Sequence, residues 1–222
     1  MERRLSTIMA ADVVGYSSHM QRNEADTILR VGRLMRVLET SAERHKGRIF
    51  NRAGDGFFLE FSSPVAAVRC AFEVQLQLAK PISKIEIGLE LRIGLHVADV
   101  MVDGDDLLGD GVNIASRIEA EAEPGNILIS GSVFEYAKRS AQLKFENLGE
   151  RHLKNIERPV MVYSVVGELG NQSCGTAIIE NDTLPTPASA ERLKNSIVVV
   201  PFRNLSNDQD QEYSKDLFFC HV

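Results

Sequence analysis

The chain has 222 residues, of which 44% are hydrophobic, and a net charge of −6, which suits one sizeable folded domain with an appendage. The acidic balance argues against nucleic acid or an anionic membrane as a general partner. The three cysteines, Cys70, Cys174 and Cys220, are far apart, so they indicate neither a disulfide framework nor a zinc site. No apolar run is long enough to cross a membrane, and we expect a cytoplasmic protein.

The N-terminal half predicts elements in the order β-α-β-β-α-β. Residues 17–45 carry apolar residues at helical spacing, and Gly47 is expected to end this helix. The apolar residues that share one face of this predicted helix are Ile28, Val31, Met35 and Leu38. The other elements of this half are strands at 5–11, 48–53, 57–61 and 89–102 and a helix at 64–79. This order is typical of a ferredoxin-like α+β core, a mostly antiparallel sheet with helices packed on it.

Extra α/β elements follow this core. They are a turn-rich loop at 104–111, a helix at 112–122, a strand at 126–130, a short helix at 133–139 and closing strands at 143–153 and 160–166. We therefore expect one domain over residues 1–166. Residues 167–195 are rich in Gly, Asn, Ser, Thr and Pro without a sustained period, which is typical of a linker. Residues 196–222 are too few for a second complete domain.

Two aspartates lie at the ends of strand-like runs. Asp12 follows an apolar run in MAADVVGYS, and Asp55 lies in the Gly-Asp-Gly turn of NRAGDGFFLEF. Two carboxylates at neighbouring strand ends can hold divalent metal ions of the kind that assist phosphoryl or nucleotidyl transfer. The alternative for Asp55 is a plain hairpin turn, because Asp-Gly is a common turn sequence.

The segment between Asp12 and the first predicted helix is a second candidate for binding. Its members are Val13, Val14, Gly15, Tyr16 and Ser17. Backbone N–H groups between a strand end and a helix start can bind phosphate, aided by the helix dipole. The alternative is an ordinary strand-to-helix loop that a serine caps.

Four longer motifs carry a family resemblance: AADVVGYS, GRIFNRAGDGFFLEF, RIGLHVADVMVDGDDLLGDGVNIASRIEAEAEPG and LGERHLKNIERPVMVYSV. Together, over residues 4–166, they resemble the catalytic domain of class III nucleotidyl cyclases, the adenylate and guanylate cyclases. The resemblance is nearest to bacterial adenylate cyclases of rhizobia and their relatives. The tail SIVVVPFRNLSNDQDQEYSKDL is similar to the start of a TolB-like region, so residues 196–222 are expected to be the truncated beginning of such a module.

The resemblance implies a role for several residues. Asp12 and Asp55 match the family's metal-binding aspartates, which hold two Mg²⁺ or Mn²⁺ ions per site. Asn113 and Arg117 are four apart and share one helix face. They match the residues that orient the ribose and stabilise charge on the α-phosphate. Lys154 is a candidate for the lysine that contacts the triphosphate, and the alternative is a solvated surface lysine.

The expected base-reading pair departs from the family pattern at one position. Asp106 stands where adenylate cyclases carry an aspartate, and a carboxylate can accept a hydrogen bond from the adenine 6-amino group while repelling the guanine O6. Asn51 stands where these enzymes carry a lysine. Its amide can donate to the purine N1, but it is shorter and uncharged. We therefore expect ATP as the substrate, with weaker or altered selectivity, unless Asn51 is only a strand residue.

The implied reaction converts ATP to 3′,5′-cyclic AMP and pyrophosphate through attack of the ribose 3′-hydroxyl on the α-phosphate. Sites of this family lie between two subunits, so a chain that carries both sets of residues is expected to form a homodimer with shared sites. Three alternatives remain open. One is a catalytically degenerate cyclase domain that binds nucleotide and regulates a partner, which Asn51 motivates. Another is a guanylate cyclase, which Asp106 disfavours, and the third is a diguanylate cyclase, whose Gly-Gly-Asp/Glu-Glu-Phe signature is missing from GDGFF.

Overall fold

The computed structural model describes residues 2–79 and 87–168, so the predicted linker beyond residue 168 and the predicted TolB-like segment lie outside the described residues. The described helices are α1 (Tyr16–Arg22), α2 (Glu24–Arg44), α3 (Pro64–Ala79), α4 (Asp110–Ala120) and α5 (Gly131–Ala137). The described strands are β1 (Glu2–Val13), β2 (Gly47–Ala53), β3 (Gly56–Phe61), β4 (Leu91–Asp103), β5 (Asp106–Leu108), β6 (Ile127–Ser130), β7 (Leu143–Arg151) and β8 (Val160–Glu168). None of the described helices has the length and apolar character needed to cross a membrane.

These strands form one sheet in the order β2-β3-β1-β4-β6-β8-β7, with β5 paired to the end of β4. The first four of them are antiparallel neighbours, as the ferredoxin-like prediction requires. β6 then pairs parallel to β4, and β8 and β7 extend the sheet in antiparallel fashion. The prediction of an α+β fold with additional C-terminal elements is therefore confirmed.

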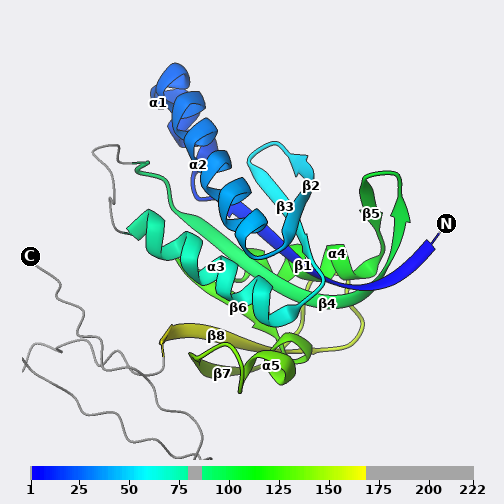
Figure 1. The fold of residues 1–222 in the computed structure, drawn as a ribbon. Helices are drawn as coiled ribbons and strands as arrows, with labels where there is room; N and C mark the ends of the chain where they lie inside the picture. The colour runs from blue at the N-terminus through cyan, green and yellow to red at the C-terminus, as the bar shows by residue number, and fades with distance from the viewer. Residues whose placement is uncertain (1, 80–86, 169–222) are drawn as a thin grey trace, which may run out of the picture. The chain divides into compact units, whose positions relative to one another are not determined.

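The central strand β1 is buried on both faces because helices cover both sides of the sheet. Met9 and Ala11 contribute to the main core, which also contains buried residues of α2, α3 and α5. Ile8 and Ala10 alternate with them and belong to a second cluster that includes Ala115 of α4. Figure 1 shows α2 and α3 on one side of the sheet and α4 on the other.

α4 lies unusually close to the sheet because two glycines remove the side chains between them. A Cβ on Gly94 of β4 would lie 2.5 Å from the carbonyl oxygen of Ala115 and 2.7 Å from the Cα of Glu119, both in the backbone of α4. A Cβ on Gly111 of α4 would overlap the Cβ of Ala98 on β4. The helix backbone therefore rests directly on β4, which fixes where each side chain of α4 leaves the helix.

The predicted helix at 17–45 was wrong in two details. It breaks at Asn23, whose extended backbone (φ −160°, ψ 95°) ends α1 and whose side chain accepts a hydrogen bond from the N–H of Asp26 to cap α2. Ile28 is 55% exposed rather than buried, and Leu34 takes its place in the core. The helix ends before Gly47, since Lys46 adopts the left-handed conformation (φ 57°) expected of a terminal glycine.

One element was missing from the prediction. The segment 104–111, expected to be a loop, contains the three-residue strand β5, which pairs antiparallel with Met101–Asp103 of β4. Gly104 and Asp105 form the tight turn between β4 and β5, and Gly104 has a positive φ of 61° that suits glycine. This hairpin places Asp106 at the start of β5, close to β2.

Candidate active site

Asp12 and Asp55 are brought together by strand pairing. Asp12 is the next-to-last residue of β1 and lies opposite Gly56 of β3 in the antiparallel register. Asp55 directly precedes Gly56 in the turn between β2 and β3. The two carboxylates thus occupy the same end of the sheet, as predicted, and both influence the same neighbouring groups on β4 and α4.

Those neighbouring groups are Arg92 and Glu119, which the sequence prediction missed. Arg92 lies directly across from Asp12 on β4 and donates a hydrogen bond of 2.6 Å to its Oδ2. The Nε of Arg92 lies 3.2 Å from Oε1 of Glu119 on α4, a carboxylate that is only 7% exposed. Burial, together with the negative charges of Asp12 and Asp55, raises the pKa of Glu119 to about 7, although Arg92 opposes this shift. The hydrogen bond to Asp12 raises the pKa of Arg92.

The donor set at this end of the sheet fits a metal ion that also takes ligands from outside the protein. Within residues 2–79 and 87–168, no group of three or more His, Cys, Asp and Glu side chains forms an all-protein metal cage. Two carboxylates alone suit Mg²⁺, which is usually bound through one or two carboxylates together with phosphates and water. Asp12 and Asp55 are both partly accessible, so each can reach a ligand outside the protein core.

Asn51 and Asp106, the two residues predicted to read the base, form a hydrogen-bonded pair. The side-chain amide of Asn51 on β2 donates a hydrogen bond of 3.0 Å to Oδ2 of Asp106 on β5. The other oxygen of Asp106 accepts a hydrogen bond from the N–H of Leu107 at 2.8 Å, which fixes the carboxylate. The pair opens onto a pocket of about 440 Å³, whose wall includes Phe50, Phe58, Asn113 and residues of the β5–α4 segment.

A β-bulge explains why two consecutive residues of β2 reach this pocket. Ile49 pairs with Leu59, but Asn51 pairs with Phe58, so Phe50 is an extra residue in the strand. Regular alternation would send Phe50 and Asn51 to opposite faces of the sheet. The bulge redirects them to the same side. There the ring of Phe50 packs against Phe58 with a centroid separation of 6.1 Å.

Asn113, Arg117 and Lys154 line a second pocket of about 530 Å³. Asn113 and Arg117 share one face of α4, as their spacing predicted, while Lys154 lies in a turn between β7 and β8. Asp110 and Asn113 line both this pocket and the one beside Asn51, so the two hollows adjoin at the start of α4. The structure therefore gathers five predicted residues, Asn51, Asp106, Asn113, Arg117 and Lys154, around α4.

The predicted phosphate-binding segment lies between β1 and α1. The N–H of Val14 is already used, since it donates to the carbonyl of Glu90 at 2.9 Å. Gly15 has a left-handed backbone (φ 64°) and is the N-cap residue of α1, so no side chain caps this helix. Val13 is buried at the end of β1, whereas Tyr16 and Ser17 open the helix with N–H groups that have no intrahelical acceptor. The available donors are therefore fewer than the sequence prediction assumed.

Comparison with known proteins identifies the family of this chain. A family model described as the adenylate and guanylate cyclase catalytic domain matches residues 3–167. The chain belongs to this family. "Putative adenylate cyclase 3" of Rhizobium meliloti is 40% identical over 220 residues, which cover 97% of this chain but 36% of that relative. The chain therefore spans about a third of the length of this curated relative.

Solved structures of cyclase domains share the fold. The adenylate/guanylate cyclase/hydrolase from Silicibacter pomeroyi is 34% identical, with a TM-score of 0.66 over 75% of this chain and 98% of that one. The adenylyl cyclase CyaB from P. aeruginosa, at 24% identity, has a TM-score of 0.64 over 75% of this chain and 96% of that one. Both confirm the fold, and the first also agrees with the family. The roles of the individual residues remain predictions.

Proposed function

We propose that this chain is an adenylate cyclase that converts ATP to 3′,5′-cyclic AMP and pyrophosphate. The observation that carries the proposal is the Asn51–Asp106 pair, at the edge of a pocket that adjoins the one lined by Asn113, Arg117 and Lys154. Asp106 offers an acceptor to the 6-amino group of adenine and opposes the O6 of guanine. The backbone N–H of Leu107 holds this carboxylate, which favours adenine without a lysine at position 51.

The two residues of α4 supply fixed donors for the reacting groups. We assign Asn113 to the ribose and Arg117 to the charge that develops on the α-phosphate. Because the backbone of α4 rests on β4 at Gly94, the helix holds the backbone of both residues in place. Preorganised donors of this kind each contribute roughly 3–4 kcal/mol to barrier lowering. Lys154 completes the set as an exposed cation for the triphosphate.

Asp12 and Asp55 are assigned to two Mg²⁺ or Mn²⁺ ions. Bound there, the ions would lower the pKa of the ribose 3′-hydroxyl and neutralise part of the triphosphate charge. Arg92 pairs with Asp12 and adds a further positive charge at the same strand ends. These residues line neither of the two pockets around α4.

The separation of the two groups supports a homodimer with shared sites. One protomer would contribute the strand-end aspartates, and its partner would contribute the residues around α4. A symmetric pairing of identical chains then creates two equivalent sites. The protein is therefore proposed to bind ATP between two copies of itself.

The direct test is cyclic nucleotide formation by the purified protein with Mn²⁺ and either ATP or GTP. Cyclic AMP from ATP is expected, with less product from GTP because of Asp106. The variants Asp55→Ala and Arg117→Ala serve as matched controls, since each should abolish activity alone. No product from either nucleotide, at high protein and metal concentration, would refute the enzyme and favour a degenerate regulatory domain.

Mixing the two inactive variants tests the shared site. In a random mixture half of the dimers contain one Asp55→Ala and one Arg117→Ala chain, and one of their two sites retains every group. Activity should therefore recover to roughly a quarter of the wild-type value, from the symmetry of the interface alone. Failure to recover, once heterodimers are demonstrated by differential tagging, contradicts the shared site.

A further inference from the structure

A buried carboxylate near Asn51 and Asp106 has no role in the proposed chemistry. Glu60 of β3 is only 7% exposed, yet it carries a charge deep in the sheet. Arg4 of β1 donates two hydrogen bonds to it, at 2.9 and 2.8 Å, and the hydroxyl of Ser6 donates another at 2.7 Å. Burial raises the pKa of Glu60, but the hydrogen bonds from Ser6 and Arg48 and the charges of Arg4 and Arg48 outweigh it and lower the pKa below its ordinary value.

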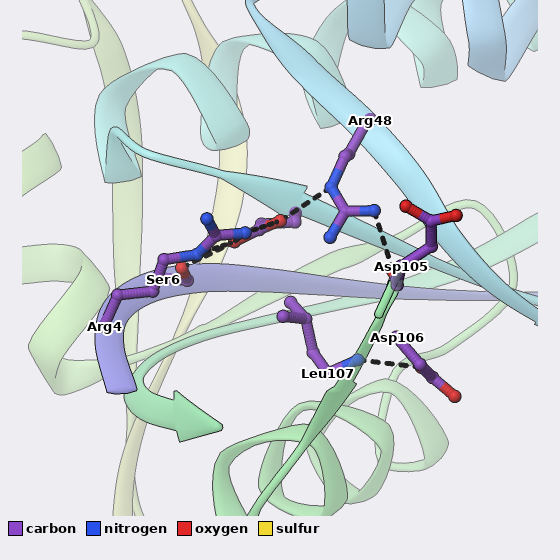
Figure 2. A network of polar contacts seen from close by, with 7 residues as sticks. Arg4, Ser6, Arg48, Asp105, Asp106 and Leu107 are labelled. Carbon is purple, nitrogen blue, oxygen red and sulfur yellow. Dashed lines mark hydrogen bonds and ion pairs between the residues drawn. The ribbon is translucent and has the colours of Figure 1, made fainter. Parts of the chain in front are cut away.

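Arg48 of β2 connects this carboxylate to the turn that precedes Asp106. Its Nε donates to Oε2 of Glu60 at 2.9 Å, and its Nη1 donates to the backbone carbonyl of Asp105 at 2.7 Å. Figure 2 shows Arg48 between the network on β1 and the Asp105 carbonyl, with Asp106 and Leu107 next along the chain. The planar guanidinium serves both acceptors at once, which a single ammonium group does not do in the same geometry.

The β4–β5 hairpin needs such an anchor. β5 has three residues and pairs only with the end of β4 in the described sheet. Short hairpins of this kind are only marginally stable alone. Two contacts tie the hairpin to β2: the bond from Arg48 to the Asp105 carbonyl and the bond from Asn51 to Asp106. These two hydrogen bonds hold consecutive residues of the hairpin, Asp105 and Asp106.

The bulge in β2 makes this double attachment possible. Arg48 and Asn51 are three residues apart, so they would lie on opposite faces of a regular strand. Because Phe50 is extra, Arg48 pairs with Glu60 and Asn51 with Phe58, two residues on the same face of β3. Both side chains therefore point toward the hairpin.

The geometry points to Arg48 as a positioning residue for base selection. By joining the buried Glu60 to the Asp105 carbonyl, it holds Asp106 against Asn51. This inference rests on the proposed adenylate cyclase activity, since Asp106 selects adenine only in that reaction. Arg48 itself touches no substrate in this arrangement and acts through the position of the hairpin.

The test compares Arg48→Met with Arg4→Met. Both variants remove a cation from Glu60, but only the first releases the hairpin. For Arg48→Met we expect the KM for ATP to rise roughly 10-fold with kcat nearly unchanged. The variant loses the charged hydrogen bond that holds the hairpin, and this weakens a base contact that substrate and transition state share equally. The preference for ATP over GTP should fall by a similar factor. Arg4→Met should keep the wild-type preference, and equal losses in both variants would overturn the inference.

A second variant and a crystal structure separate a loss of hairpin position from a loss of folding. Arg48→Lys retains a charge for Glu60 and so protects folding, but it should still lose selectivity because it lacks the fork. A crystal structure of either Arg48 variant should show the Asn51 Nδ2–Asp106 Oδ2 pair separated, whereas it is 3.0 Å here. An unchanged distance overturns the inference. If the wild-type protein makes no cyclic nucleotide, the proposed function fails, and the distance still decides whether Arg48 positions the hairpin.

Discussion

Replacing Gly94 by alanine tests the close packing of α4 on β4. The new methyl group would lie 2.5 Å from the carbonyl oxygen of Ala115 and 2.7 Å from the Cα of Glu119, with the N–H of Glu119 closer still. All three are backbone atoms, so no side chain can rotate away. Ordinary contact requires more than 3.4 Å, and the helix must therefore retreat by about 1 Å along its whole contact.

The expected cost has two parts. Overpacking against a rigid backbone costs about 3 kcal/mol, the upper part of the usual range. For a domain of this size that corresponds to a fall in Tm of roughly 6–12 °C. A displacement of about 1 Å in the helix that carries Asn113 and Arg117 should reduce kcat by roughly 100-fold.

Gly32→Ala is the matched control, because it is the same substitution with the opposite expected sign. Gly32 lies in α2, where an added Cβ meets nothing within 4 Å. Alanine there should stabilise the protein by about 0.5–1 kcal/mol, since it favours the helix. Urea denaturation measures both changes, and cyclic nucleotide formation measures the effect on activity. Wild-type stability of Gly94→Ala would show that the backbone of α4 does not rest on β4 at this position.

Three other predictions follow from the site. The pKa of Glu119 is raised from 4.5 to about 7, so protonation of Glu119 favours the folded, metal-free protein. This contribution to the free energy of unfolding, at most about 3 kcal/mol, is complete below pH 4.5 and is lost as the pH rises through about 7. Urea denaturation in EDTA across this range should show the slope, Glu119→Gln should remove it, and an equal slope in both proteins contradicts the assignment. Asn51→Lys should lower the KM for ATP roughly 5-fold, because a charged donor gains about 1 kcal/mol over a neutral one; an unchanged KM means that position 51 does not read the base. EDTA should abolish activity and excess Mn²⁺ restore it in the wild type but not in Asp55→Asn, and activity that survives EDTA would exclude the metal role.

Much of the fold followed from local patterns in the sequence. The strands and helices of the core had clear periods, and the spacing of Asn113 and Arg117 correctly placed them on one face of α4. Asp55 was located correctly because a Gly-Asp-Gly turn between two apolar runs is a strong hairpin signal. These features depend on residues close in sequence, so they were accessible without the tertiary structure.

Other features depend on partners that are distant in sequence. The bulge at Phe50 is defined by the register against β3, and no residue of β2 marks it. Arg92 and Glu119 meet Asp12 only because β4 pairs with β1 and α4 packs beneath both. Ile28 fits the helical period as well as Leu34 does, and only the docking of α2 decides which of them is buried. The sequence could therefore place the main candidate residues but not the groups that hold them.

The extra residue in β2 makes two properties of the pocket independent of each other: its polar pair and one of its two aromatic side chains. Deleting Phe50 would leave Ile49 opposite Leu59 and Asn51 opposite Phe58, which is an ordinary unbroken ladder. Asn51 and Asp106 would keep their face, while the pocket wall would lose the ring of Phe50 and retain that of Phe58. The polar edge of the pocket and the aromatic ring beside it can thus be inherited, lost or engineered separately, through the presence or absence of a single residue of β2.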